Sequence, residues 1–511
     1  MSRIRFGHRL ARNRKHHGQL SARQRILSLE LLETRQYLSA SPTATPDYVA
    51  LHLANGATPQ STSGPGGMTP AEIKQAYGIT GTGANTTIAI VDAYDDPDIA
   101  NDLTQFDSAF GLANPPSFIK ENQNGGGSLP AGNKGWATEI ALDVEWAHAI
   151  APAANILLVE ANSSSFSDLM TAVNTARNTA GVVAVSMSWG GGEFSGETSY
   201  DSDFTTPSGH SGVSFFVSSG DDGAPVSYPA ASPNVVSVGG TTLDLSGSNY
   251  GSESAWSGSG GGVSSQESQP AYQKGVVTQS TTARTDPDVA YDADPNTGFP
   301  VYDSYNNGTA KPWGQWGGTS DAAPQWAAIT AIADSNRLAA GLGTLDGASQ
   351  TLPALYQLPT SDFHDITSGT TTGSPKYSAT AGYDLATGRG TPIANLVIAG
   401  LSTWTGSGGG GQTGTAPAAP ASFSVQATSS TQVSVNWSLS SGATSYSVYS
   451  ELAGGQSVLD GTYGASTTST TVNNLTPGQT YAFQVVATNS VGSGSTAWKN
   501  VTMPAATLAA P

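Results

Sequence analysis

Hydrophobic positions in the central part of the chain follow two patterns, short continuous runs and longer helical stretches. Continuous runs are typical of parallel strands that are buried on both faces. We expect strands at 87–92, 155–160, 182–188, 213–218 and 235–238. We expect helices at 97–106, 136–150, 167–177 and 326–333, after a first helix that begins near residues 68–72. This alternation predicts an α/β domain with a parallel sheet and helices on both faces.

Polar side chains stand at the ends of three predicted strands. Asp92 ends one strand, while Trp189 and Asp221 follow two others. In open parallel sheets the ligand site lies beyond the carboxyl ends of the strands. We therefore expect the chemistry of the protein there.

The C-terminal part shows strict alternation of apolar and polar residues, as in Val433, Val435 and Trp437. This period of two predicts a small antiparallel β-sandwich. Residues 418–505 resemble a fibronectin type III module, through Trp437 and the run from Leu475 to Tyr481. The resemblance implies that Tyr481 forms the corner of the sandwich. A Gly-rich flexible linker over 405–417 precedes the module.

The N-terminal region differs from both domains. Residues 1–45 are basic and then amphipathic, and they resemble export leaders of large secreted bacterial proteins. A disordered basic tail, or a start codon placed too far upstream, remains as an alternative. Residues 46–67 are rich in Pro, Ser, Thr and Gly and are interpreted as a linker to a domain over 68–404.

Composition narrows the function classes. A chain of 511 residues contains several domains. The absence of cysteine excludes disulfides and thiolate metal sites. Net charge is −18 although residues 1–36 hold nine Lys and Arg against two Glu. Such acidity disfavours nucleic-acid binding, and no apolar run is long enough to span a membrane.

One short stretch suits a nucleophile. Gly318-Thr319-Ser320 leads into the apolar helix pattern at 326–333. Glycine allows a substrate backbone to approach, and a helix N-terminus places partial positive charge near the serine hydroxyl. Ser and Thr are also favoured helix N-caps, so an ordinary capping turn is the alternative.

The usual histidine base has no candidate. Four of the seven histidines precede the predicted domain, and none stands in a His-Gly-Thr helix start. His148 lies inside a predicted helix, where a packed histidine is the simpler interpretation. An ordinary subtilisin mechanism is therefore excluded.

Two carboxylates offer a replacement base. Glu139 and Asp143 are four residues apart and share one face of the predicted helix. A solvated acidic face is the alternative. If both were buried they would share a proton, which raises one pKa and produces a base that works in acid.

These stretches together resemble the sedolisins, serine-carboxyl peptidases with a subtilisin-like fold, over residues 68–402. The resemblance rests on motifs in the family's order: Glu139-x-x-x-Asp143, Ser188-Trp189-Gly190, Ser219-Gly220-Asp221, Gly318-Thr319-Ser320, and a C-terminal Asp365-Ile366 with the loop Gly382-Tyr383-Asp384. It implies that Ser320 is the nucleophile, Glu139 the general base and Asp143 the residue that orients it. It further implies that protonated Asp221 donates to the oxyanion, and that Asp92 and Trp189 support the base.

The resemblance also implies one structural calcium ion. Asp365 and Ile366 match half of the family's site, through a side chain and a carbonyl. Thr380, Gly382 and Asp384 match the other half, through two carbonyls and a carboxylate. Hard oxygen ligands of this kind suit Ca²⁺. A Gly-rich turn with incidental aspartates is the alternative.

Two functions follow as hypotheses. The first is a secreted or cell-surface serine-type endopeptidase that hydrolyses proteins or peptides at acidic pH. The second is a catalytically silent surface or adhesion protein that binds a polymer or protein partner through the fibronectin-like module. Asp321 keeps the second open, because a small or apolar residue more usually follows the nucleophile.

Overall fold

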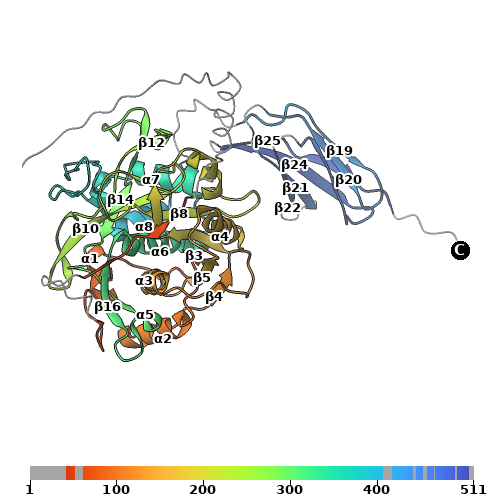
Figure 1. Ribbon diagram of the computed structural model, residues 1–511. Coiled ribbons are helices and arrows are strands. Elements are labelled where there is room, and N and C mark those ends of the chain that lie inside the picture. The colour runs from red at the N-terminus through yellow and green to blue at the C-terminus, as the bar shows by residue number, and fades with distance from the viewer. Residues whose placement is uncertain are drawn as a thin grey trace, which may run out of the picture. The chain divides into compact units, whose positions relative to one another are not determined.

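A mainly parallel eight-stranded sheet forms the centre of the larger domain (Figure 1). The computed structural model describes residues 42–51, 61–406, 417–440, 443, 445–452, 457–464, 467–489 and 492–505. The strands follow the order β11-β10-β8-β6-β3-β5-β4, and β14 pairs with β10 outside this path. Their bounds are β3 (Thr87–Ala93), β4 (Phe118–Asn122), β5 (Asn155–Ala161), β6 (Val182–Met187), β8 (Ser214–Ser218), β10 (Val236–Ser246), β11 (Asn249–Ala255) and β14 (Val289–Asp292).

Helices cover both faces of this sheet, as the alternation predicted. Ile88 and Ile90 of β3 pack in one core cluster with the helices α3 and α6, whereas Ala89 and Val91 pack with α4 on the opposite face. The helices are α1 (Pro70–Tyr77), α2 (Ile99–Phe110), α3 (Lys134–Ile150), α4 (Phe166–Asn178), α5 (Ser304–Asn307), α6 (Thr319–Ala339), α7 (Leu352–Gln357) and α8 (Ala394–Ser402). The parallel α/β prediction is therefore confirmed.

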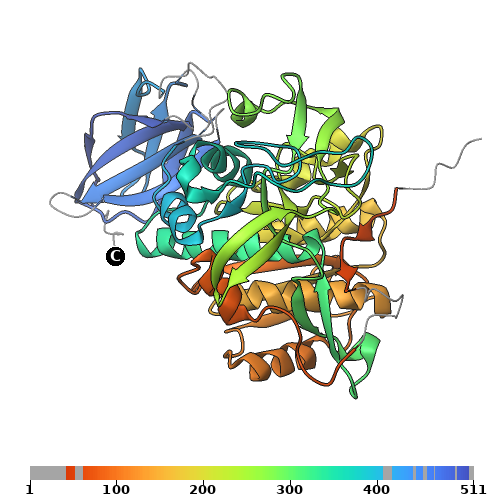
Figure 2. The same ribbon diagram turned by 90° about the vertical axis from the view of Figure 1, so that its left-hand side faces the viewer.

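One edge of the sheet departs from the expected pattern. The predicted strand at 235–238 continues to Ser246, and its second half pairs antiparallel with β11 in a hairpin, visible in Figure 2. Strand β11 is mostly polar, with the sequence Asn-Tyr-Gly-Ser-Glu-Ser-Ala, and only its last residue is buried. A search for apolar runs therefore misses this strand.

Short strands pair outside the main sheet. They are β1 (Thr45–Pro46), β2 (Val49–Ala50), β7 (Trp189–Gly192), β9 (Ser227–Tyr228), β12 (Gly262–Ser268), β13 (Ala283–Asp286), β15 (Phe299–Tyr302), β16 (Trp313–Gly317), β17 (Phe363–His364) and β18 (Thr391–Pro392). Strand β1 pairs with β7, and β2 pairs with β16.

The prediction of a linker over 46–67 is therefore wrong in part. Residues 42–51 run in extended form against strands of the larger domain, and Thr62 pairs with Trp313. Strands of two residues take their structure from hydrogen bonds to the strands beside them, so they leave no periodicity in the sequence. Most of the predicted leader, 1–45, and of the Gly-rich linker, 405–417, lies outside the described residues.

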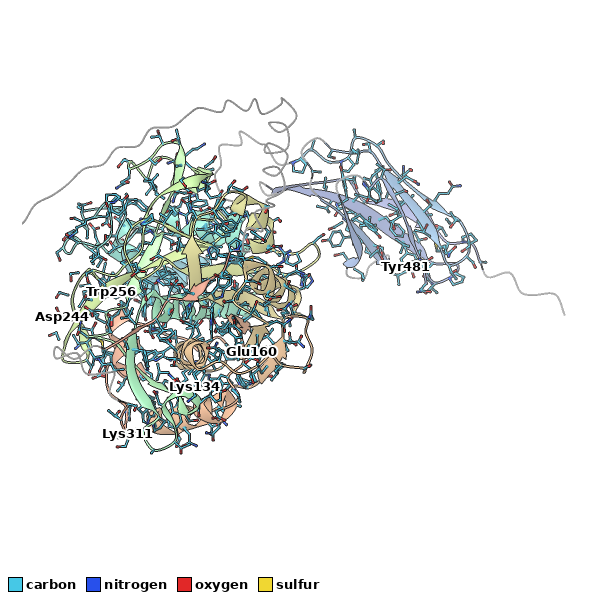
Figure 3. The ribbon with its side chains drawn as sticks, in the orientation of Figure 1. Lys134, Glu160, Asp244, Trp256, Lys311 and Tyr481 are labelled. Atoms are coloured by element: carbon cyan, nitrogen blue, oxygen red, sulfur yellow. The ribbon has the colours of Figure 1, made fainter. Side chains whose placement is uncertain are left out.

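The C-terminal domain is the predicted antiparallel sandwich. One sheet has the order β19-β20-β23, and the other is β22-β21-β24-β25 with β26 paired to β24. The strands are β19 (Phe423–Ala427), β20 (Val433–Trp437), β21 (Ser445–Leu452), β22 (Ser457–Gly464), β23 (Ser469–Val472), β24 (Thr480–Asn489), β25 (Gly492–Ser495) and β26 (Lys499–Thr502). Trp437 lies in the core. The hydroxyl of Tyr481, labelled in Figure 3, accepts the N–H of Thr476 at 3.1 Å, as a corner tyrosine does.

Among the described helices, none combines the length and the apolar character that a membrane crossing requires.

Candidate active site

The first turn of α6 delivers Ser320 into the interior. Gly318 is the N-cap residue of α6, so Ser320 does not cap the helix and that alternative is wrong. Gly318 has φ +110°, and a Cβ there would lie 2.5 Å from Asp221 Oδ2, so the turn requires glycine. Ser320 is fully buried, and its Oγ donates to Glu139 Oε2 at 3.0 Å. The serine hydroxyl therefore has a carboxylate, not an imidazole, as its hydrogen-bond acceptor.

Glu139 and Asp143 project from α3 into the site, and both are 0% exposed. The alternative of a solvated acidic face is wrong. Asp143 Oδ1 accepts the hydroxyl proton of Ser188 at 2.8 Å. His148, on the same helix, contacts the carbonyl of Ala113 at 2.9 Å instead. The two carboxyls thus form a coupled pair next to the nucleophile.

Burial sets the protonation of this pair. Removal from water raises the pKa of both Glu139 and Asp143 well above the ordinary range. The charge of Asp143 raises the pKa of Glu139 further, and the hydrogen bond from Ser320 partly offsets this. Since like charges this close cannot all ionise, the carboxyls share protons and titrate as a unit.

Asp92 joins this unit from the end of β3. Burial raises its pKa to about 8, and its charge in turn raises the pKa of Asp143. Neither carboxylate oxygen of Asp92 has a hydrogen-bond partner among the described residues. Trp189 donates its indole N–H to the carbonyl of Val91 at 2.7 Å, which holds the end of β3. This hydrogen bond links Trp189 to the strand that carries Asp92.

Asp221 lies in the loop after β8, beside the nucleophile. Its Oδ1 accepts both the N–H of Thr319 at 2.8 Å and the hydroxyl of Thr319 at 2.9 Å. Its Oδ2 is buried and has no partner within the described part of the chain. Burial raises the pKa of Asp221 well above its usual range, and the charges of Asp47 and Asp222 raise it further. A protonated Oδ2 would be a free donor.

A carbonyl oxygen already marks the position that such a donor would face. The N–H of Ser320 donates to the carbonyl of Asp47 at 3.1 Å. The carbonyl oxygen of Asp47 lies 2.5 Å from the position that a Cβ on Gly318 would occupy, and Asp221 Oδ2 lies 2.5 Å from the same position. The two oxygens are therefore separated by at most twice this distance. The serine N–H and the aspartic acid are thus placed around one oxygen site.

Two family models and several known proteins match this chain. Residues 79–342 match the model of the subtilase family, and 418–502 match the fibronectin type III domain. Kumamolisin from Bacillus sp. (strain MN-32) is 31% identical over 411 residues, covering 73% of this chain and 70% of its own length. The chain belongs to the sedolisin family of serine-carboxyl peptidases. By this membership it is a serine-type peptidase.

Two further matches concern sedolisin itself. The sedolisin of Pseudomonas sp. (strain 101) is 32% identical over 385 residues, which are 68% of this chain and 62% of that protein. A solved structure of Pseudomonas sedolisin, a serine-carboxyl proteinase complexed with two molecules of pseudo-iodotyrostatin, matches with a TM-score of 0.58 and 29% identity. The match covers 66% of this chain and 98% of that one, and it confirms the subtilisin-like fold.

Asp321, which follows Ser320 directly in the chain, is also buried. Both of its carboxylate oxygens lack hydrogen-bond partners among the described residues. Burial raises its pKa well above the usual range, and the charges of Asp292, Asp143 and Asp221 add to this. In acid Asp321 is therefore neutral and places no charge beside Ser320.

The residues matched to the sedolisin calcium site lie on two adjacent segments. Asp365 accepts the N–H of Gly382, at 3.0 Å to Oδ1 and 3.2 Å to Oδ2. Asp384 accepts the N–H of Thr380 at 2.9 Å, and Ile366 is buried next to Asp365. Within the described ranges no three His, Asp or Glu side chains converge on a point, so main-chain carbonyls would have to complete a site. Two carboxylates with carbonyl oxygens fit the preference of Ca²⁺.

Three positions in the site had no role predicted for them. Ser188 bridges Asp143 and the carbonyl of Ser320, and Thr319 holds Asp221. Ser188 and Thr319 belong to motifs that were recognised in the sequence, but the sequence does not show which side chains they contact. Asp47 lies far from any motif, and no sequence signal marks it.

Proposed function

We propose that the chain hydrolyses peptide bonds as an endopeptidase in acid, through a Ser320–Glu139–Asp143 triad with Asp221 as oxyanion donor. The observation that carries the proposal is the hydrogen bond of 3.0 Å from Ser320 Oγ to Glu139 Oε2 in a buried site. A catalytic serine needs such a base within hydrogen-bond reach.

Each step follows from these contacts. Ser320 Oγ attacks the substrate carbonyl carbon as its proton passes to Glu139. The oxygen of that carbonyl gains negative charge and is stabilised by the N–H of Ser320 and by protonated Asp221. Glu139 then gives the proton to the leaving nitrogen, and water hydrolyses the acyl-serine by the same route. Asp143, held by Ser188, keeps Glu139 in place.

Digestion of a denatured protein at acidic pH tests this function. The wild-type chain is expected to release peptides, whereas Ser320→Ala is expected to release none, because the attacking oxygen is gone. Equal melting temperatures of the two proteins serve as the control for folding. If the wild type leaves the substrate intact from acid to neutral pH, the peptidase proposal fails and the silent adhesion protein takes its place.

We further propose that Asp365, Asp384 and the carbonyls of Ile366, Thr380 and Gly382 hold one Ca²⁺. The ion would supply positive charge that ties the segment after β17 to the loop at 380–384. A ligand that binds only the native state stabilises it by linkage. Chelation is therefore expected to lower the melting temperature of the wild type. The Asp365→Asn variant should start lower and respond less, and an unchanged melting temperature of the wild type with chelator would refute the site.

The other two proposals concern location and partners. We propose that the protein is secreted or displayed at the cell surface, in keeping with its acid mechanism and the family's members. The fibronectin type III domain would then bind a surface polymer or a protein partner, while the peptidase domain acts on protein or peptide substrates.

A further inference from the structure

The oxyanion loop, residues 219–223 with Asp221 inside it, packs against the glycine-rich segment 258–260. The N–H of Gly260 donates to a carbonyl of the loop at 2.7 Å, and the carbonyl of Gly258 accepts an N–H of the loop at 3.0 Å. A Cβ on Gly260 would lie 2.1 Å from a carbonyl oxygen of the loop, so the two segments meet backbone against backbone. Strand β12 begins two residues after Gly260. The position of β12 therefore bears on the position of the oxyanion loop.

Strand β12, labelled in Figure 1, has two attachments. It pairs with β13, but the register of this pairing is broken within β12. The second attachment is Glu193, which follows β7 directly and accepts the N–H of Ser265 at 2.9 Å and its hydroxyl at 2.8 Å. The hydroxyl of Ser264 donates to the other oxygen of the same carboxylate. Glu193 thus ties β12 to β7, whose glycines line a cavity beside Asp221.

Two buried glutamates lie next to this attachment. Glu197, at the start of the 3₁₀-helix η1 (Glu197–Phe204), is 0% exposed, and its Oε1 has no hydrogen-bond partner among the described residues. Glu267, near the end of β12, is 7% exposed, and its Oε1 likewise lacks a partner within the described ranges. The charges of Glu193 and Glu267 both raise the pKa of Glu197. Three glutamates from three segments therefore share one buried space.

The other titratable and charged groups that act on these glutamates and their neighbours are mostly acidic or neutral. They come from η1, β9 and the region of β13: Asp201, Tyr228, Arg284, Asp286 and Asp288. The cation, Arg284, lowers the pKa of Glu267, but its guanidinium already donates to both oxygens of Asp288, at 2.8 and 2.7 Å. Asp201 accepts the hydroxyl of Tyr228 at 3.1 Å and its charge raises the pKa of Glu267. The surroundings thus disfavour further negative charge.

We propose that Glu193, Glu197 and Glu267 form a proton-dependent clamp that positions β12 and, through it, the oxyanion loop. While Glu197 and Glu267 are neutral, Glu193 can hold Ser264 and Ser265 without a second charge beside it. When the two ionise, three negative charges repel in a buried space, and separation of β12 from β7 relieves the repulsion. The clamp follows from the contacts above, and its effect on catalysis rests on the proposed peptidase function. The three glutamates are positioning residues.

The pH range of the clamp follows from its buried members. Burial, and then neighbouring carboxylates, raise the pKa of Glu197 to about 8 and that of Glu267 to about 7. Because the folded chain holds these protons more tightly than the unfolded chain, the contribution is fully present below pH ~4.3, the ordinary value for glutamate. It is lost as the pH rises through 7 to 8. The clamp is therefore closed in acid and opens near and above neutral pH.

Hydrogen exchange of the Ser320→Ala chain, read by mass spectrometry from pH ~4 to ~8.5, tests the clamp without interference from proteolysis. Protection factors, which correct for the intrinsic effect of pH on exchange, are compared between segments. Amides at 262–268 and 219–223 are expected to be protected in acid and to lose protection as the pH passes 7 to 8, while those of the central strand β3 stay protected. Protection of 262–268 that does not change with pH, or that falls together with that of β3, would overturn the proposal.

Replacing both Glu197 and Glu267 by glutamine in the same chain should keep the clamp closed at neutral pH. Glutamine preserves the size of each side chain and an acceptor for the N–H of Phe194, but it cannot ionise. At pH ~8 the protection of 262–268 is expected to be about tenfold or more above that of the parent, since each unit of pH above a pKa changes the ionisation ratio tenfold. Glu145→Gln, at a buried glutamate on α3, should follow the parent. Equal profiles for the double variant and the parent would refute the role of the two glutamates.

Ser265→Ala gives a second test that does not depend on a buried substitution. Ser265 is exposed, and alanine removes only the hydroxyl that donates to Glu193. Exchange at 262–268 in acid is expected to become about fivefold faster, the usual effect of one lost hydrogen bond. The melting temperature should stay close to that of the parent. Unchanged exchange would remove Glu193 from the clamp.

An assay of a peptide substrate with the intact Ser320 separates the clamp from the proposed function. If exchange follows the expected pattern but the wild type cuts no peptide at any pH, the clamp stands and the peptidase function fails. If the wild type cuts peptides while protection of 262–268 is independent of pH, the function stands and the clamp fails. If both hold, the loss of kcat/KM toward pH 8 should reverse on return to acid and should be smaller in the double glutamine variant. An equal loss in that variant would refute the effect of the clamp on catalysis.

Discussion

Replacing Glu139 by glutamine is expected to slow peptide hydrolysis by about 10²–10⁴-fold in kcat, the usual contribution of a general base. Glutamine keeps the size of the side chain and can still hydrogen-bond to Ser320, but it cannot take the serine proton. Steady-state kinetics on a peptide substrate at acidic pH measure the loss. KM should change much less than kcat, since Glu139 contacts the nucleophile and not the substrate.

Glu145 provides a matched control on the same helix. Glu145 is buried, accepts the N–H of Tyr302 at 3.0 Å, and has a pKa raised well above its usual range by burial. It belongs to no part of the catalytic set, and Glu145→Gln should keep the wild-type kcat. Equal kcat values for Glu139→Gln and the wild type would remove Glu139 from the mechanism.

Replacing Asp221 by alanine is expected to cost about 10²–10³ in kcat, the usual effect of losing one oxyanion donor. Asp221→Asn keeps a neutral donor in the same place, so it should lose less. Thr319→Val gives a smaller, graded effect, because it removes one of two hydrogen bonds that hold Asp221 Oδ1. An Asp221→Ala variant as active as the wild type would eliminate Asp221 as the donor.

Five strands of the sheet could be predicted, because β3, β5, β6, β8 and the first half of β10 are buried and therefore read as apolar runs. Strands β4 and β11 are partly exposed and β14 has only four residues, so they were not predicted. The catalytic pair was harder to judge. All residues of α3 from Trp136 to Ile150 are buried, so this helix has no solvent face at all. From the sequence of such a helix one cannot tell whether a carboxylate points into an active site or to water. Only the packing of α6 against α3 distinguishes the two.

The extended segment 42–51 could not be predicted from the local pattern of apolar and polar residues. Pro46 and its small polar neighbours are typical of a linker, and the strands β1 and β2 have two residues each. Their partners lie more than 100 positions away in the chain, at Gly190 and Trp316. Long-range backbone pairing of this kind leaves no trace in composition. Asp321 is similar, because only its burial shows that its carboxyl is neutral in acid.

Buried carboxyls also link the stability of the fold to pH. Burial raises the pKa of Asp92 from 3.8 to about 8 and that of Asp286 from 3.8 to about 7. The folded chain therefore binds more protons than the unfolded chain between these values. The stability that these two carboxyls contribute is fully present below pH ~4 and is lost as the pH rises through 7 to 8. Any loss of activity above neutrality must therefore be separated from unfolding.

The pH dependence of kcat/KM, measured with the melting temperature at each pH, tests the carboxyl mechanism most directly. Glu139 must be able to accept a proton while Asp221 must still carry one, and unperturbed carboxyls titrate near pH ~4 with burial raising them. We expect a maximum in acid and a decline as Asp221 ionises. In Asp221→Asn that decline should move to higher pH while the melting temperature stays above the assay temperature. A maximum near pH ~8, well above ordinary carboxyl values, or identical profiles for the two proteins, would contradict it.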